Sequence, residues 1–401
     1  MSLFRRLRKA TIIFACSGVM IVFVLLGLLW LDHNRETVLP TPTGSFTVGR
    51  TTYLWSDQIK TDSLATQQGG RRRIFAWIWY PASPRQSDSI VAEYLPSSWR
   101  TALERHDGLL LTQFLTRNLS RVRPHSLQDA AISPRQRSYP VTLMRAGLAA
   151  LTTDYTSLAE DLASHGYVVV GFDAPYRSRI VVLPDGTVLE RSPRNDADLF
   201  SGVEQDRLVL KLVQEWSADM DFALHQLERL NASDPSGRFQ GKLDLQRVGV
   251  FGHSLGGASA LQFCHDDSRC KAGVDVDGSP VGTVVQTGIR QPFLFLLSDH
   301  SGESDTQTRQ IKENIRAIYD RLPPDRRGEI EIQGANHFGF SDNGAMLKSP
   351  LIMRVLRSLN IVRLDGRCQI AITAGYIRAF FDANLKETPV PEKASGNEKT
   401  R

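Results

Sequence analysis

The sequence predicts an α/β fold, with a mainly parallel sheet and helices on both faces, preceded by one N-terminal transmembrane helix. Short apolar, β-branched segments such as 167–172 recur along the chain, and they are typical of strands buried on both faces of a parallel sheet. Segments with helical periodicity separate them, which is the order of βαβ units. With 401 residues, 41% of them hydrophobic, the chain can also bury a large core.

The first 31 residues carry the signal for the membrane. Residues 10–31 contain no charged residue and no histidine, and at about 1.5 Å per residue they can cross a bilayer core of about 30 Å. This stretch is longer than the apolar region of a cleaved signal peptide and ends without a small-residue cleavage site, so we predict an uncleaved signal anchor. Residues 1–9 form a basic flank without acids. The positive-inside rule therefore predicts a single-pass protein with a cytoplasmic N-terminus and an external catalytic domain, periplasmic in a bacterium.

Charge and cysteine content exclude some classes of function. The basic flank supplies most of the net charge of +5, so the rest of the chain is nearly neutral and nucleic-acid binding is not indicated. The four cysteines are too few for a disulfide framework, and Cys264 and Cys270 are equally compatible with a disulfide or with two buried thiols. No metal-binding motif is present, and we expect no cofactor and no metal.

Composition divides the remaining chain into a linker, one domain and a tail. Two prolines mark 32–45 as a linker, and the domain is predicted over 46–385. Periodicity weakens over 82–139, which we interpret as an insertion with one helix near 109–119. Residues 386–401 are polar and are predicted to be a disordered tail.

Within the domain, strands and helices are predicted to alternate. A helix is expected over 155–164, ending at the glycine of His165-Gly166, and a long amphipathic helix over 200–230. An Asp-Gly turn predicts a hairpin over 181–189. Strands are predicted at 46–54, 73–80, 140–144, 167–172, 247–251, 272–276, 293–297 and 330–332.

The segment Gly252-His253-Ser254-Leu255-Gly256 is the strongest functional motif in the chain. A β-branched run precedes it and a helix-compatible run follows it, which is the context that a G-x-S-x-G nucleophile elbow requires. The two glycines allow a strained turn and a close approach of helix and strand. Ser254 is therefore the predicted nucleophile. His253 precedes it, and because neighbouring side chains diverge at a sharp turn, we interpret His253 as structural.

A serine hydroxyl needs a histidine base and a carboxylate behind it. In α/β-hydrolases these follow in the order serine, acid, histidine. Only three histidines, His265, His300 and His337, follow Ser254. His265 lies about three turns into the elbow helix and is expected to point away. His300 is a possible base, but His337 stands just beyond the last predicted strand, where a catalytic histidine enters, and is the predicted base.

Three aspartates compete for the role of acid. Asp275 lies inside a predicted strand, Asp277 ends that strand, and Asp299 ends the next one. The carboxyl edge of a parallel sheet is where catalytic groups gather. Spacing alone leaves Asp277 and Asp299 open.

From about residue 71 to residue 340 the chain resembles the platelet-activating factor acetylhydrolase family, of plasma type and its bacterial relatives, within the α/β-hydrolase superfamily. The resemblance rests on five segments in matching order. It implies that the acid is Asp277, with Asp299 as the alternative used by other α/β-hydrolases. It also places the second backbone donor of the oxyanion hole at Leu148, beside the donor at Leu255 that follows the nucleophile. The segments are 252–258, 161–167, 272–278, 291–293 and 334–337.

The expected function is hydrolysis of carboxylic esters through an acyl-enzyme. The resemblance implies short or oxidised acyl chains on phospholipids, which suits a membrane-anchored domain. At the oxyanion turn the usual His-Gly is replaced by Ala146-Gly147, which weakens inference about substrate preference. The same triad also serves peptidases, thioesterases and acyltransferases, and an inactive binding protein on this fold is a further alternative.

Overall fold

A nine-stranded sheet forms the centre of the molecule, seen in a computed structural model that describes residues 2–66, 69–108, 116–299, 306–346, 350–359 and 362–386. The strand order is β13-β12-β11-β10-β6-β7-β3-β2-β5. Neighbours from β13 to β7 are parallel, whereas β3 runs antiparallel to both β7 and β2. The strands are β2 (Thr47–Thr61), β3 (Arg71–Ala82), β5 (Leu127–Gln128), β6 (Tyr139–Arg145), β7 (Val168–Asp173), β10 (Leu243–His253), β11 (Cys270–Val276), β12 (Phe293–Leu297) and β13 (Arg327–Glu331).

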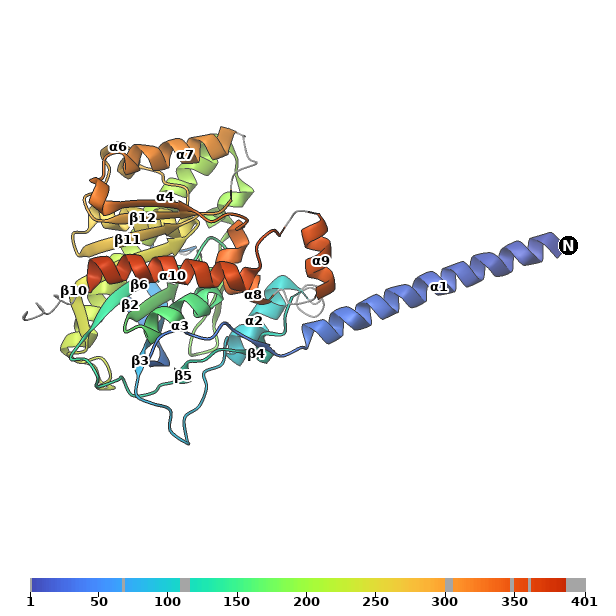
Figure 1. The fold of residues 1–401 in the computed structure, drawn as a ribbon, viewed down its shortest axis with the longest axis horizontal. Helices are drawn as coiled ribbons and strands as arrows, with labels where there is room; N and C mark the ends of the chain where they lie inside the picture. Colours follow the sequence, from blue (N-terminus) through green and yellow to red (C-terminus); the bar gives the residue numbers. More distant parts are fainter. Residues whose placement is uncertain are drawn as a thin grey trace, which may run out of the picture.

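Helices cover both faces of this sheet, as Figure 1 shows. The apolar residues of α3 and α10 share one core with β11, while those of α4, α5, α6 and α7 share a second core on the opposite face. A disulfide between Cys264 and Cys270 joins the end of α5 to the start of β11. These helices are α3 (Thr156–Ser164), α4 (Gly202–Ala232), α5 (Leu255–Asp266), α6 (Thr283–Thr287), α7 (Thr306–Tyr319) and α10 (Gly366–Leu385).

Shorter elements surround this body. Two small sheets pair β1 (Thr37–Val38) with β4 (Val122–Arg123) and β8 (Ile180–Val182) with β9 (Val188–Glu190). The remaining α-helices are α2 (Ser97–Asp107), α8 (Asp342–Met346) and α9 (Pro350–Ser358). The 3-10 turns are η2 (Leu119–Arg121), η3 (Thr152–Tyr155), η4 (Pro193–Asn195), η5 (Ala197–Leu199), η6 (Pro324–Arg326) and η7 (His337–Phe340).

The predicted fold class is confirmed, and the predicted strands and the 181–189 hairpin correspond to observed elements. The helix expected near 109–119 falls mostly outside the described residues. The described residues of 82–139 include α2, and β5 from the same segment extends the main sheet at its edge. The predicted tail, 386–401, lies outside the described residues except for Lys386.

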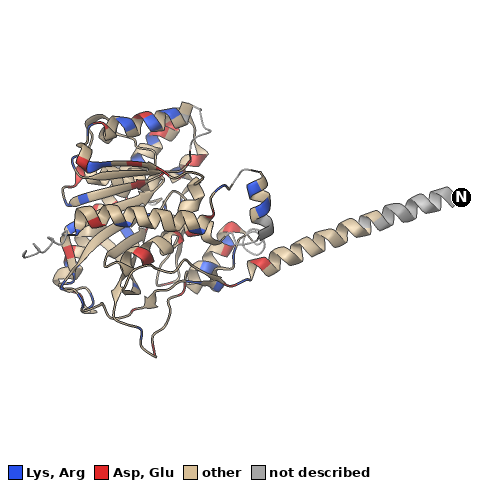
Figure 2. Cartoon of the chain, in the orientation of Figure 1, with Lys and Arg blue, Asp and Glu red and all other residues tan. Residues whose placement is uncertain are grey.

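The N-terminal helix α1 (Ser2–His33) projects away from the domain (Figure 1), and its 16–33 part is long and apolar enough to cross a membrane. Figure 2 shows that this part carries almost no charge before the helix reaches the domain. Residues 32–45, predicted as a linker, are packed against the domain. Leu39 is buried, and the Thr43 hydroxyl donates to the Asp161 carboxylate at 2.7 Å. The helix is therefore joined to the domain by an ordered segment.

Candidate active site

Ser254 stands at the turn between β10 and α5. Its backbone has φ 56° and ψ −126°, which is a strained conformation for a residue with a side chain. Glycine is required at both flanking positions because there is no room for a side chain. A Cβ at Gly252 would lie 2.2 Å from the Gly256 oxygen, and one at Gly256 would lie 2.3 Å from the Arg145 oxygen. The local sequence therefore forms the predicted elbow because nothing larger than glycine fits beside the turn.

His337 and Asp277 are brought together although 60 residues separate them. The His337 Nδ1 atom lies 2.7 Å from Asp277 Oδ2, at the carboxyl edge of the sheet. Asp277 is nearly buried, and its other oxygen accepts from the backbone N–H and the hydroxyl of Ser298, at 2.8 and 2.9 Å. These bonds hold the carboxylate in one orientation. With its Nδ1 proton donated to Asp277, His337 keeps Nε2 as the basic atom.

Asp299, the alternative acid, has different partners. Its Oδ2 atom accepts from the backbone N–H of Gly334 at 2.8 Å and lies 3.4 Å from Arg363 Nη1, and its own N–H donates to the Ala335 oxygen at 3.0 Å. These contacts hold the loop that leads into His337.

Asp275, the third candidate, is fully buried beneath the elbow. It accepts from the Gly278 N–H at 2.8 Å. Burial raises the pKa of Asp275 well above its usual value, and the negative charge of Asp277 adds to the effect. Through its bond to the Gly278 N–H, this carboxyl group supports the turn that carries Asp277.

The expected oxyanion donors lie on two segments that meet beside Ser254. Leu255 is the first residue of α5, so its N–H has no acceptor within the helix. The turn before Leu148 touches the elbow directly, because a Cβ at Gly147 would lie 3.3 Å from Ser254 Cβ. Leu148 and Leu255 also pack against one small apolar cluster that includes Leu212.

Two residues in contact with His337 or Asp277 were not among the predicted site residues. His253 is buried, its ring centroid lies 4.5 Å from that of His337, and its Nδ1 atom lies 2.7 Å from the Tyr155 hydroxyl. Ser298 holds Asp277, as described above. His253 belongs to the elbow motif, but the motif does not indicate which residue it contacts. Nothing in the sequence marks Tyr155 as that partner, because the two residues are 98 positions apart.

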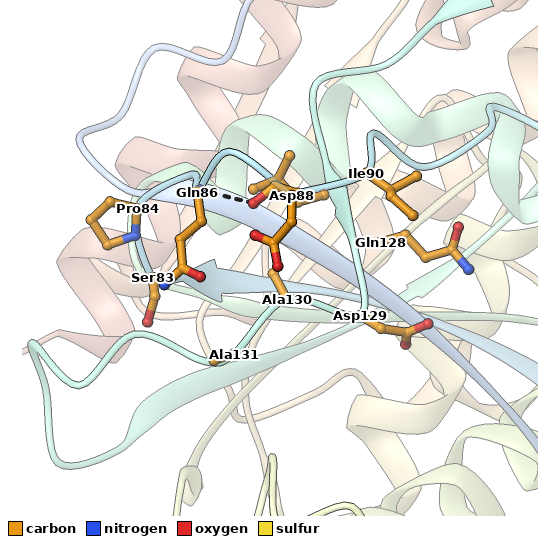
Figure 3. Close-up of a pocket in the computed structure, with 11 residues that line it drawn as sticks. Ser83, Pro84, Gln86, Asp88, Ile90, Gln128, Asp129, Ala130 and Ala131 are labelled. Atoms are coloured by element: carbon orange, nitrogen blue, oxygen red, sulfur yellow. Dashed lines mark hydrogen bonds between the residues drawn. The ribbon is translucent and has the colours of Figure 1, made fainter.

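Two surface pockets lie apart from this constellation. A pocket of about 350 Å³ is formed by residues 83–90 and 127–131 beside β5, the edge strand (Figure 3). Another of about 490 Å³ lies between residues 56–60 and α4. Neither is lined by the elbow, by Asp277 or by His337. Among the described residues, no cluster of three His, Cys, Asp or Glu side chains is arranged to hold a metal ion.

A third cavity, of about 270 Å³, lies where α1 meets the domain. It is lined by His33 at the end of α1, by α2, by residues 116–120, and by Asp154, Arg179 and Asn343. Arg117 connects α1 with α8. Its Nε atom donates to the Met346 oxygen at 2.7 Å, and its Nη1 atom lies 3.0 Å from Asp32 Oδ1. The end of the apolar helix is thus tied to α8, the helix that follows the His337 turn.

The fold and the site together define an α/β-hydrolase. Residues 31–389 match the profile of the family described as platelet-activating factor acetylhydrolase, isoform II, and the chain belongs to that family. By this membership it is an ester hydrolase.

Individual relatives are distant. The chain is 23% identical over 329 residues to platelet-activating factor acetylhydrolase of Canis lupus familiaris, covering 77% of this chain and 69% of the relative. It is 25% identical over 252 residues to a probable 1-alkyl-2-acetylglycerophosphocholine esterase of Arthroderma benhamiae, covering 60% and 58%. The guinea pig (Cavia porcellus) acetylhydrolase is 25% identical over 218 residues, and the match spans about half of each chain.

A solved structure shares the fold. The ferulic acid esterase from Streptomyces cinnamoneus superposes with a TM-score of 0.70 at 23% identity, covering 91% of this chain and 97% of that one. At this level of identity the likeness extends to the fold alone.

Proposed function

We propose that the chain hydrolyses carboxylic esters through an acyl-enzyme formed on Ser254. The observation that carries the proposal is the 2.7 Å contact between His337 Nδ1 and Asp277 Oδ2 beside the strained elbow. His337 Nε2 takes the proton of the Ser254 hydroxyl as the hydroxyl oxygen attacks the ester carbonyl, and returns it to the leaving alcohol. Water then attacks the acyl-enzyme by the same proton transfers in reverse order. Asp277 stabilises the imidazolium that forms in each step.

The developing oxyanion is proposed to be held by the backbone N–H groups of Leu148 and Leu255. Loss of one such donor typically costs about 3 to 4 kcal/mol of transition-state stabilisation. The Leu148 peptide has a defined direction, because the Gly147 oxygen accepts from the Ala150 N–H at 3.2 Å. In a planar trans peptide the N–H of Leu148 then points the opposite way.

We propose that the substrates are short-chain acyl esters of lipids at a membrane surface. One relative is named as an acetylhydrolase and another as a probable 1-alkyl-2-acetylglycerophosphocholine esterase, and α1 supports a membrane location for this chain. From the basic N-terminal flank we also propose a cytoplasmic N-terminus, with the domain on the other side of the membrane. The docking of α1 beside Asn343, six residues after His337, favours a site close to the bilayer.

A fluorophosphonate probe tests the nucleophile. Full-length protein in detergent is expected to be labelled, and Ser254→Ala is expected to abolish both the labelling and the hydrolysis of p-nitrophenyl acetate. Absence of labelling in folded wild-type protein would refute the proposal.

The acid is tested by a matched pair of substitutions. Asp277→Asn is expected to lower kcat by about 10⁴-fold, because it removes the charge behind the histidine. Asp299→Asn keeps the shape of a group that contacts Gly334 and is expected to act chiefly on stability. A larger loss of kcat in Asp299→Asn than in Asp277→Asn would reverse the assignment.

The substrate class is tested on lipids. Phosphatidylcholines with acetyl, hexanoyl and palmitoyl chains at one position are presented in mixed micelles, and kcat/KM is expected to fall as the chain lengthens. A rise with chain length would replace the short-chain proposal.

A further inference from the structure

A second histidine lies directly against the proposed base. The rings of His253 and His337 have centroids 4.5 Å apart and are tilted by 39°, so they pack against each other. His253 is buried, and Phe340 packs near the same ring at 5.7 Å. One side of the base is therefore bounded by the ring of the residue that precedes Ser254.

The hydroxyl of Tyr155 bridges the oxyanion turn and His253. The Gly147 N–H donates to the Tyr155 oxygen at 3.3 Å, and this oxygen lies 2.7 Å from His253 Nδ1. A neutral tyrosine has one proton to donate, and we assign that proton to the contact with Nδ1. This assignment puts the single proton of neutral His253 on Nε2, a buried atom without a hydrogen-bond partner among the described residues.

Both members of the pair stay neutral. Burial, reinforced by repulsion from His337, lowers the pKa of His253 to about 3, although the charge of Asp277 opposes the shift. Burial also raises the pKa of the Tyr155 hydroxyl above its usual value. The direction of the hydrogen bond is thus the same throughout the range in which an esterase works.

We propose that Tyr155 and His253 are a pair of positioning residues that couples the oxyanion turn to the base. Tyr155 holds Gly147 on the turn, and His253 supports the ring of His337 by packing against it. The inference rests on the function proposed above for Ser254 and His337.

The packing of the turn explains why the pair acts on both groups. A Cβ at Gly147 would lie 3.2 Å from His253 Nδ1 and 3.3 Å from Ser254 Cβ, so the turn, the pair and the nucleophile are in direct contact. Loss of the Tyr155 hydroxyl releases the Gly147 N–H and removes the donor to His253 at the same time. A displacement of about 1 Å at such a site can lower the rate about 100-fold.

Tyr155→Phe is the first test, with Tyr139→Phe as its matched control. Both tyrosines are buried and both hydroxyls are hydrogen-bonded, but the Tyr139 hydroxyl donates to the Ser133 oxygen at 2.9 Å, outside the site. Tyr155→Phe is expected to lower kcat for p-nitrophenyl acetate by about 10- to 100-fold with KM within about twofold. Tyr139→Phe is expected to leave kcat within about twofold while its thermal stability falls.

A double-mutant cycle supplies the second test. His253→Phe keeps a ring against His337 but removes the acceptor of Tyr155, so the two single variants are expected to lose similar factors of kcat. The double variant is then expected to be no slower than the slower single variant, since both changes break one interaction. If Tyr155→Phe fails to fold, His253→Phe alone tests the inference, because it is likewise expected to lower kcat while leaving KM nearly unchanged.

The inference is overturned if the kcat of Tyr155→Phe stays within about threefold of the wild-type value. It is also overturned if the kcat loss of the double variant equals the product of the losses of the two single variants. Fluorophosphonate labelling separates this failure from failure of the proposed function. Wild-type protein that is labelled and active, beside an unimpaired Tyr155→Phe, removes the inference and leaves the function standing. Unlabelled, inactive wild-type protein removes both.

Discussion

Acid is expected to destabilise the protein through His253. The pKa of this histidine is lowered from 6.5 to about 3 in the folded protein, chiefly by burial. Below pH 6.5 the unfolded chain binds a proton that the folded protein does not, so the free energy of unfolding falls by about 1.4 kcal/mol for each pH unit. Between pH 8 and pH 4.5 the loss attributable to His253 is therefore about 2.7 kcal/mol.

His253→Asn isolates this contribution. It removes the titrating ring and leaves an amide oxygen as an acceptor near Tyr155. Urea unfolding of full-length protein in detergent, followed by tryptophan fluorescence, is compared at pH 8 and at pH 4.5. The wild-type protein is expected to lose about 2.7 kcal/mol more than the variant between the two conditions.

Comparing wild type with variant cancels the contributions that other titrating groups make to the pH dependence of stability. Buried carboxyl groups such as Asp275 and Asp342 have raised pKa values and act in the opposite direction, since the folded protein keeps protons that the unfolded chain releases. Their effect is common to wild type and variant and cancels in the difference. Equal losses, within about 1 kcal/mol, would mean that folded His253 takes up its proton near pH 6.5, and the account of its environment would be refuted.

Three further substitutions test the surroundings of the site. Asp219→Asn is expected to lower the free energy of unfolding by about 3 to 5 kcal/mol in urea titrations, because it breaks a buried pair in which Arg177 donates two bonds of 2.7 Å. Gly256→Ala is expected to cost about 3 kcal/mol or more in the same assay, since its Cβ would overlap the neighbouring turn. Ser298→Ala is expected to lower kcat/KM about fivefold in steady-state kinetics, because it removes one bond of about 1 kcal/mol to Asp277.

The fold and the elbow were predictable because local chemistry specifies them. Apolar β-branched runs form central strands wherever they occur, and a serine between Gly252 and Gly256 forms the strained turn because a larger neighbour would overlap the backbone. His337 was predictable from chain order together with its place just beyond the last predicted strand. In each case the signal lies within a few neighbouring residues of the sequence.

Contacts across long separations were not predictable. Tyr155 lies at the start of a helix and shows only helical periodicity in the sequence, yet its hydroxyl reaches both Gly147 and His253. Residues 32–45 have the composition of a linker, but Thr43 binds Asp161, which is 118 residues away. Composition describes what a segment favours when alone, and partners on other elements decide its final state.

The competition between the two strand-end aspartates illustrates this limit. Asp277 and Asp299 end adjacent parallel strands, so the sheet brings both carboxylates to the same edge. What separates them is the path of the loop before His337, and that path is held by Asp299 itself through Gly334 and Ala335. With the loop held there, the His337 ring is directed to Asp277. The alternative acid thus supports the geometry in which the other aspartate contacts the proposed base, and both carboxylates contribute to the candidate site in different ways.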